Sequence, residues 1–180
     1  MAQIVNKFYE IDELLQYFTG STATTATTKK YAATGIGTGF AVGDTVLVAG
    51  FSNTASNGVK TIAYIHTDAS YITVSEAIGA DESGVSATFN QTYNGAWQDV
   101  GGCTVLIGTI RTSGNCSVYT DWSWDRGVTT EFSESANSIT GGTAESMGEI
   151  VVIAPYARCR VVNNGADQTV MSIYFGGRDY

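Results

Sequence analysis

The sequence is poor in the residues on which most enzymes and metal sites depend. It contains one histidine, three cysteines and one proline among 180 residues, and only 14% of its residues are charged. A single histidine cannot form a multi-histidine metal site, and we expect His66 at a strand end or in a turn. Cys103, Cys116 and Cys159 follow no CxxC or other ligand spacing, so we expect buried thiols rather than a disulfide framework or a zinc site. These shortages predict a protein that is not an enzyme and has no catalytic residues, metal or cofactor.

Positive charge and long apolar runs are also scarce. Nine Lys and Arg residues stand against 17 Asp and Glu residues, which gives a formal net charge of -8. Affinity for nucleic acid comes largely from basic side chains that neutralise phosphates, so this balance argues against a DNA or RNA partner. Nowhere do 18 apolar residues run together, and acidic residues interrupt the start of the chain where a signal peptide would be apolar. We therefore expect no membrane span and no secretion by that route.

Small and β-branched residues are abundant instead. Hydrophobic residues make up 43% of the chain, which is enough for a packed core. The 21 glycines, together with many Thr, Ser, Ala and Val residues, favour short strands and tight turns. The composition therefore predicts an all-β fold.

One pattern at the start of the chain is typical of a helix rather than a strand. Apolar residues recur there at steps of four, three, four and three, which places on one helical face the residues Ile4, Phe8, Ile11, Leu15 and Phe18. Gly20 would end this helix, and the Thr-rich segment that follows predicts an extended arm up to residue 39. A terminal helix must bury its apolar stripe on its own domain or in a groove of another chain, so these five residues are candidates for partner binding.

Strand and turn signals begin at Phe40. Four or five short apolar runs follow, separated by turn residues such as Asn57-Gly58, whose glycine can supply the positive φ of a tight hairpin. We predict a small barrel-like β-domain over residues 40–92. Residues 93–180 contain about six further runs, which predict a sandwich of two antiparallel sheets. Jelly-roll connections are favoured over an immunoglobulin-like order because no Cys-Trp-Cys pattern is present.

Two pairs of residues are candidates for an interface. Alternation in the segment ARCRVVN places Arg158 and Arg160 on one strand face, opposite to Cys159, so both arginines should point outward or across an interface. Trp122 and Trp124 form the second pair. With Trp97 and the ten tyrosines they could also form a platform for a sugar, but strand cores and subunit interfaces prefer aromatic residues as well. The sequence does not separate these uses.

The segment DWSWDRG, residues 121–127, is the one stretch with the spacing of a metal loop. Asp121, Ser123 and Asp125 alternate as they do in calcium loops, but the sixth and twelfth positions hold an arginine and a phenylalanine instead of Gly and Glu. A strand that ends in an Arg-Gly turn is therefore favoured. The same two aspartates could form the carboxylate pair of a glycosidase, which is the weakest alternative.

Residues 40–90 resemble a small β-domain that recurs in structural proteins of tailed bacteriophages. The shared pattern is Phe-x-x-Gly-Asp-x-Val-x-Val-x-Gly-Phe, then Asn-Gly-x-x-Thr-Ile, then Thr-Val and an acidic turn. The second half is similar to phage jelly-roll or sandwich modules, and the residues that match their late strand are Tyr156, Arg158, Arg160, Val161, Asn163, Gly165 and Ala166. Arg126 departs from the family pattern, because it separates Asp125 from Gly127 where an Asp-Gly turn is usual.

This resemblance implies a virion component without catalytic activity. The family includes capsid decoration or cement proteins, bases of head fibres and tail-associated adhesins, which commonly assemble as trimers. It implies the major capsid protein and other virion proteins as partners, and the capsid surface as the location after assembly in the host cytoplasm. We expect residues 1–39 to engage the shell or a neighbouring subunit. The alternative is a tail or head-fibre adhesin that binds host surface polysaccharide.

Overall fold

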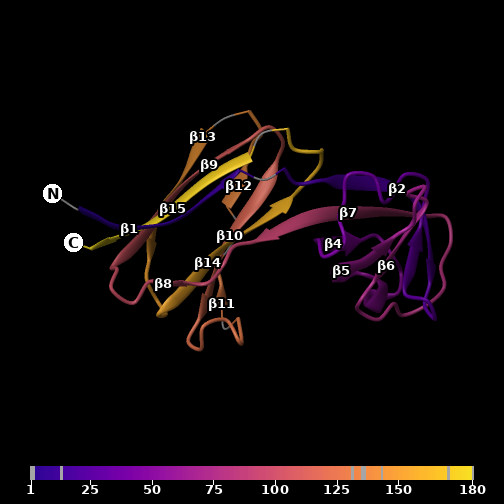
Figure 1. The fold of residues 1–180 in the computed structure, drawn as a ribbon, viewed down its shortest axis with the longest axis horizontal. Coiled ribbons are helices and arrows are strands. Elements are labelled where there is room, and N and C mark those ends of the chain that lie inside the picture. The colour runs from indigo at the N-terminus through magenta and orange to yellow at the C-terminus, as the bar shows by residue number, and fades with distance from the viewer. Residues whose placement is uncertain are drawn as a thin grey trace. The chain divides into compact units, whose positions relative to one another are not determined.

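The computed structural model describes residues 3–12, 14–130, 132–134, 137–142, 144–169 and 171–179 of the chain. Contacts divide the chain into two compact units. Unit 1 comprises Met1–Leu15 and Tyr93–Tyr180, and unit 2 comprises Gln16–Thr92, so unit 2 is inserted into unit 1 along the chain. The strands pair in antiparallel fashion, and the described residues contain no α-helix (Figure 1). The all-β prediction is confirmed.

Six strands of unit 2 pair in a closed ring. They are β2 (Tyr17–Thr25), β3 (Lys30–Ala32), β4 (Thr45–Ala49), β5 (Gly58–Ile65), β6 (Tyr71–Val74) and β7 (Val85–Asn94). Along the ring β2 pairs with β3, β3 with β6, β6 with β5, β5 with β4, β4 with β7, and β7 again with β2. Closure removes the exposed strand edges that an open sheet would have. The 3-10 turn η1 (Thr54–Ser56) precedes β5.

Alternation along these short strands turns apolar side chains into the ring. Val46 and Val48 of β4 are buried, while the residue on either side of Val46 is only partly buried. Tyr31 of β3 is fully buried, and its ring meets Phe89 edge-on with the centroids 5.1 Å apart. Its hydroxyl donates a hydrogen bond to the carbonyl of Ser56 at 2.6 Å, as a buried phenol requires. Burial, with a smaller effect of nearby Glu76, raises the pKa of Tyr31 well above its usual range.

Unit 1 contains two antiparallel sheets. The first has the order β1 (Gln3–Asp12), β15 (Met171–Asp179), β9 (Val105–Thr112) and β13 (Ala144–Val151). In the second, β14 (Tyr156–Asn163) lies between β8 (Gln98–Asp99) and β10 (Cys116–Ser123). The other side of β10 pairs with two short strands, β11 (Phe132–Ser133) and β12 (Asn137–Ile139).

The core of unit 1 draws on both sheets, as in a β-sandwich. Leu106 and Ile110 of β9 belong to the same buried cluster as Val118 and Trp122 of β10. From β14, Ala157, Cys159 and Val161 also enter this cluster, while Tyr156, Arg158 and Arg160 stay partly exposed. Two of the three cysteines, Cys116 and Cys159, are buried thiols in this core, whereas Cys103 is only half-buried.

The helix predicted over residues 4–18 is not seen. Residues Gln3–Asp12 instead form β1, which pairs with β15 so that Ile11 lies opposite Ile173 (Figure 1). A lone helix of about 15 residues is marginal in water, and this segment is rich in β-branched and aromatic residues that favour a strand. Two register shifts interrupt the pairing of β1, between Ile4 and Asn6 and between Lys7 and Tyr9. These bulges break the period-two alternation that would have marked a strand in the sequence.

The five residues of the predicted stripe do not share one face. The side chains of Ile4, Phe8 and Ile11 lie outside the described part of the structure. Leu15 is 1% exposed and belongs to the core of unit 1, whereas Phe18 packs against the core of unit 2 with its ring 5.9 Å from that of Phe89. The last two residues of the stripe therefore stabilise different units.

The predicted Thr-rich arm is part of unit 2. Its residues supply the end of β2 and all of β3, and Ile36 is fully buried. Thr24 is buried because its hydroxyl can donate to the carbonyl of Ala80 at 2.8 Å, which satisfies the polar atom inside the unit. Residues 1–39 thus form no unit of their own, and the division of the rest of the chain into domains 40–92 and 93–180 stays a prediction. No helix among the described residues is long and apolar enough to cross a membrane.

Candidate partner-binding face

The outer face of the β10–β14 pair carries a cluster of charged and aromatic residues. Alternation along β10 turns Val118 and Trp122 into the core, so Tyr119 and Asp121 lie on the opposite face. The antiparallel register then sets Asp121 directly across from Arg158, and Tyr119 across from Arg160. Opposite charges paired across two strands stabilise a sheet. We call the cluster formed by Trp97, Tyr119, Asp121, Arg158 and Arg160 the arginine face.

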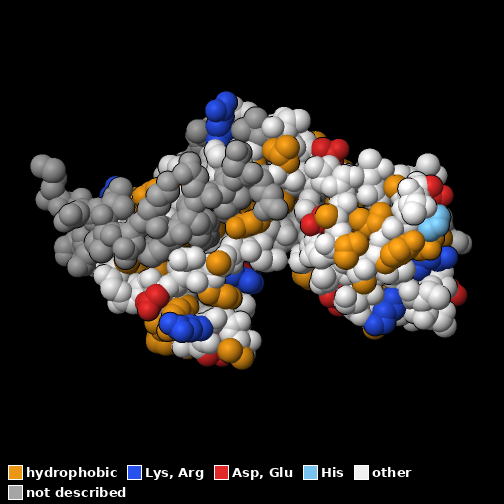
Figure 2. All heavy atoms as spheres, viewed as in Figure 1, with side chains coloured by type: hydrophobic (Ala, Val, Ile, Leu, Met, Phe, Trp, Pro, Cys, Tyr) orange, Lys and Arg blue, Asp and Glu red, His pale blue; other side chains and the backbone are white. Residues whose placement is uncertain are grey.

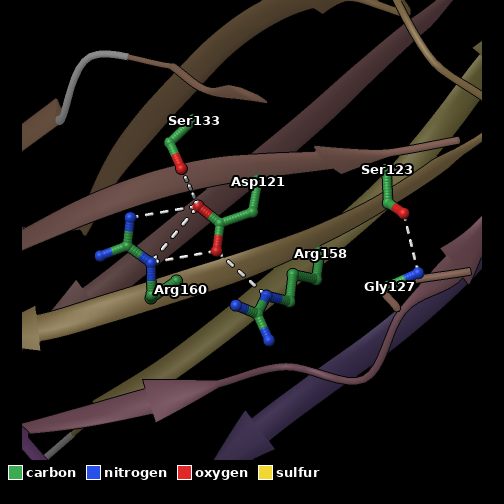
Figure 3. Close-up of polar contacts among 6 residues, drawn as sticks. All are labelled: Asp121, Ser123, Gly127, Ser133, Arg158 and Arg160. Atoms are coloured by element: carbon green, nitrogen blue, oxygen red, sulfur yellow. Dashed lines mark hydrogen bonds and ion pairs between the residues drawn. The ribbon is translucent and has the colours of Figure 1, made fainter. Parts of the chain in front are cut away.

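One carboxylate holds both arginines of this face (Figure 3). The Nε atoms of Arg158 and Arg160 each donate to Oδ2 of Asp121 at 3.0 Å, and Nη2 of Arg160 donates to Oδ1 at 3.1 Å. The hydroxyl of Ser133 on β11 donates to the same Oδ1 at 2.6 Å. The Asp121 side chain is only 1% exposed, whereas the two arginines are 22% and 23% exposed. The buried carboxylate thus fixes both guanidinium groups, while part of each arginine side chain stays exposed at the surface.

The charges of this cluster do not balance. Burial works to raise the pKa of Asp121, but hydrogen bonds and positive charge from Arg160, together with Ser133 and Arg158, outweigh it and hold that pKa below its usual range. Asp121 is therefore ionised near neutral pH. Its one negative charge lies next to the two positive charges of Arg158 and Arg160. The arginine face carries a surplus positive charge on a chain whose formal net charge is -8.

Aromatic rings fix the guanidinium groups from the side. The Cζ atom of Arg160 lies 4.0 Å from the ring centroid of Tyr119, and that of Arg158 lies 4.8 Å from the ring of Trp97. Arg126 lies over Tyr156 at 5.7 Å on the next turn. Cation–π contacts of this kind favour one orientation of an otherwise flexible side chain. The arrangement is therefore pre-organised for contact with another surface.

The loop after β10 supports Trp97. The hydroxyl of Ser123 accepts from the backbone N–H of Gly127 at 2.8 Å (Figure 3) and donates to Asp125 at 2.7 Å. Arg126 and Gly127 both adopt positive φ, at 61° and 87°. A Cβ on Gly127 would collide with the indole of Trp97, so glycine is needed there for space as well as for φ. The predicted Arg-Gly turn is thus the support on which Trp97 rests.

Asp125 takes part in this loop. It accepts from the backbone N–H of Thr129 at 3.0 Å and from the Ser123 hydroxyl, and these bonds lower its pKa. Across the described part of the chain, no group of three or more His, Cys, Asp and Glu residues could hold a metal ion. Asp121 is also unsuited to act as the acid of a glycosidase, because a general acid needs a raised pKa. What the arginine face can do chemically is donate hydrogen bonds and bind negative charge.

The two tryptophans named from the sequence lie in different surroundings. Trp122 is fully buried in the core of unit 1, so it presents no surface to a partner or a sugar. Trp124 follows the end of β10 and is 64% exposed, beside an apolar depression of about 270 Å³ that Ile153 and Pro155 also line. The strand ends between the two residues, which is why they do not share a face.

His66 lies at the surface of unit 2, in the turn between β5 and β6 that the sequence predicts. Its Nδ1 is 2.5 Å from Oδ1 of Asp68, and its ring stacks on Tyr71 with the centroids 4.5 Å apart. Hydrogen bonds from Ser70, followed by that of His66, hold the pKa of Asp68 far below its usual range. Figure 2 shows the pale blue histidine beside hydrophobic side chains on the drawn face of this unit.

No protein-family model matches the chain, and no curated protein matches it either. The arginine face must therefore be interpreted from its own geometry. Arg158 and Arg160 lie together, as alternation predicts, but sequence reasoning missed that Asp121 holds them and that Trp97 and Tyr119 orient them. Alternation in DWSWDRG could have placed Asp121 on an outer face, but its pairing with Arg158 depends on a strand register that the sequence does not specify.

Proposed function

We propose that this chain is a non-enzymatic structural protein of a tailed-bacteriophage virion, of the capsid decoration or cement type. It binds the major capsid protein at the capsid surface and stabilises the head. The resemblance of residues 40–90 and of the second half to phage virion modules supports this proposal. In it, the ring of unit 2 is the barrel-like module of that family, and the sandwich of unit 1 has jelly-roll connections.

The arginine face is the observation that carries the binding role. Arg, Trp and Tyr are the residue types most enriched at the energetic centres of protein interfaces. Here a buried carboxylate holds the two arginines and aromatic rings pack against them, so little conformational entropy remains to be lost on binding. The surplus positive charge favours an acidic patch on the partner, and a trimer would present the face three times and raise the overall affinity for a repeating shell.

Co-sedimentation with undecorated phage heads tests this proposal. The decisive variant replaces Asp121, Arg158 and Arg160 together by leucine, because exchanging a whole buried ion cluster for apolar residues usually preserves the fold. We call it the apolar variant. We expect the wild-type protein to sediment with the heads and the apolar variant to remain in the supernatant.

A matched control removes positive charge elsewhere. Arg111→Ala deletes an exposed arginine from β9, on the other sheet of unit 1, and should leave sedimentation unchanged. Circular dichroism confirms that each variant is folded. If the wild-type protein does not sediment with heads, or if the folded apolar variant sediments as well as the wild type, the proposal is wrong.

A further inference from the structure

The two arginines of the arginine face are bound to Asp121 to different degrees. Arg158 donates to the carboxylate through Nε alone, which lies 3.0 Å from Oδ2. Arg160 turns a whole edge of its guanidinium group to the carboxylate, because its Nε lies 3.0 Å from Oδ2 and its Nη2 lies 3.1 Å from Oδ1. The dashed lines of Figure 3 accordingly reach one nitrogen of Arg158 and two nitrogens of Arg160. Arg158 therefore keeps more of its hydrogen-bonding capacity for another molecule.

The two Nη atoms of Arg158 are the donors that stay available. A guanidinium group has five N–H donors, and four of them belong to the Nη atoms. No hydrogen bond joins either Nη atom of Arg158 to another described residue, and both point away from Asp121 in Figure 3. Among the described residues, the buried side-chain atoms without a partner include Nε of Arg178 but neither Nη atom of Arg158. These two atoms, which we call the outer edge of Arg158, are thus accessible on a side chain that is 22% exposed.

Two contacts fix the direction of this outer edge. The hydrogen bond from Nε ties the guanidinium group to Asp121, and the ring of Trp97 restrains it from the side, with Cζ 4.8 Å from the ring centroid. A cation–π contact supplies no oxygen acceptor to the N–H groups, so the four Nη–H donors remain available for one. A group that is restrained in this way loses little freedom when a partner binds it.

Shape and charge together indicate which group the outer edge takes. Two parallel N–H donors match the paired oxygens of a carboxylate, and they also match those of a phosphate. A phosphate group carries about 1.5 to 2 negative charges near pH 7. The two arginines and Asp121 leave a surplus of a single positive charge, which one carboxylate balances and a phosphate exceeds. The arginine face is therefore better suited to a carboxylate.

We propose that the outer edge of Arg158 binds the carboxylate of an Asp or Glu side chain on the partner protein through two parallel hydrogen bonds. Arg160 does not offer a complete edge in the same way, because its Nη2 already donates to Asp121. The inference rests on the proposed role of the arginine face in binding and names the chemical group that the face recognises. It also distinguishes two arginines that are almost equally exposed, at 22% and 23%.

Titration of the 15N-labelled full-length protein with short peptides tests this contact without phage heads. The probes are a triglutamate peptide with blocked termini, the matching triglutamine peptide and inorganic phosphate. The reporters are the Nε–H signal of Arg158 and the indole N–H signal of Trp97. We expect triglutamate to shift both signals in a saturable way, triglutamine to shift neither, and phosphate to bind more weakly than triglutamate.

Variants that preserve charge locate the contact. Arg158→Lys keeps the positive charge but lacks the paired donors, so it should weaken triglutamate binding about tenfold, the loss of one charged hydrogen bond. Arg160→Lys should weaken binding by less than about threefold. Arg111→Lys changes an exposed arginine of β9, on the other sheet of unit 1, and should bind as the wild type does. The comparison of the three probes needs only the wild-type protein, so the test remains valid where a variant fails to fold.

Three outcomes would overturn the carboxylate contact. The first is the absence of a saturable shift with triglutamate, or an equal shift with triglutamine. The second is phosphate binding as tight as that of triglutamate. The third is a loss of affinity in Arg158→Lys that is no greater than the loss in Arg160→Lys.

The capsid role and the carboxylate contact can fail separately. Triglutamate binding by a protein that does not sediment with heads would contradict the capsid role alone. Sedimentation with heads by a protein that does not bind triglutamate would contradict the carboxylate contact alone.

Discussion

The two sheets of unit 1 each carry an arginine next to a carboxylate, but the two carboxylates differ in burial and in how tightly they bind the arginine. On the arginine face, Asp121 is 1% exposed and holds two guanidinium groups at 3.0 Å. On the other sheet, Glu149 of β13 is 53% exposed, and its Oε1 lies 3.4 Å from Nη1 of Arg178 on β15. A guanidinium group and a carboxylate are therefore paired to different degrees at the two sites. A buried, saturated carboxylate fixes its arginines as a rigid surface, whereas an exposed carboxylate at a longer distance holds its arginine less firmly.

Removal of each carboxylate should give the largest difference in stability between the two sites. Asp121→Ala leaves two half-buried arginines without a counter-charge, and we expect it to lower the free energy of unfolding by about 3 kcal/mol. Glu149→Ala removes an exposed partner and should change that free energy by less than about 0.5 kcal/mol. Urea denaturation of both variants checks the difference. Equal effects would show that burial of the carboxylate does not distinguish the two sites.

Substitution of two glycines with positive φ should give a smaller difference in stability. Gly127 lies below the arginine face, and Gly148 lies in β13 where its pairing with β9 shifts register. Both have left-handed backbone, so alanine at either site should cost about 1 kcal/mol. A Cβ at Gly127 also displaces Trp97, whereas at Gly148 it meets nothing within 4 Å. We expect Gly127→Ala to be about 1 kcal/mol more destabilising than Gly148→Ala. Thermal unfolding measures both, and a smaller loss at Gly127 would contradict the packing of Trp97.

The smallest expected effect is the loss of stability at acidic pH that arises from Asp121. The pKa of Asp121 is depressed in the folded state, so this residue binds a proton less readily there than in the unfolded chain. Its stabilising contribution is therefore complete above the unfolded pKa of about 3.9 and disappears as the pH falls through the lower folded pKa. Below about pH 4 we expect the wild-type protein to lose stability more steeply than the apolar variant, which lacks this carboxylate. Denaturation curves recorded across this pH range give both slopes, and equal slopes would contradict the depressed pKa.

The sequence is informative wherever a local rule decides the structure. Composition and alternation indicate the all-β class, and the spacing of Arg158 and Arg160 indicates their shared face. The tight hairpin predicted at Asn57-Gly58 is confirmed only in the backbone conformation of the glycine. Gly58 does take a positive φ of 88°, but η1 and a longer connection replace the tight hairpin between β4 and β5. The Asn57 side chain closes that connection by bonding both the N–H and the carbonyl of Phe51.

The remaining features depend on pairings between distant segments. The helix-like spacing near the N-terminus results from a strand whose bulges hide its alternation, and only its pairing with β15 reveals it. Trp122 and Trp124 look alike in the sequence, but the end of β10 separates a buried ring from an exposed one. The register shift between Ser146 and Glu149 likewise depends on how β13 pairs with β9, and Gly148, with its positive φ, is the one local sign of it.

Hydroxyl-radical footprinting of the protein bound to phage heads tests most directly which sheet faces the partner. Trp97, Tyr119 and Tyr174 are all half-buried in the chain alone, so their labelling rates can be compared. We predict that binding to heads slows the labelling of Trp97 and Tyr119 on the arginine face and leaves Tyr174 of β15, on the other sheet of unit 1, unchanged. Protection of Tyr174 without protection of Trp97 and Tyr119 would contradict the account.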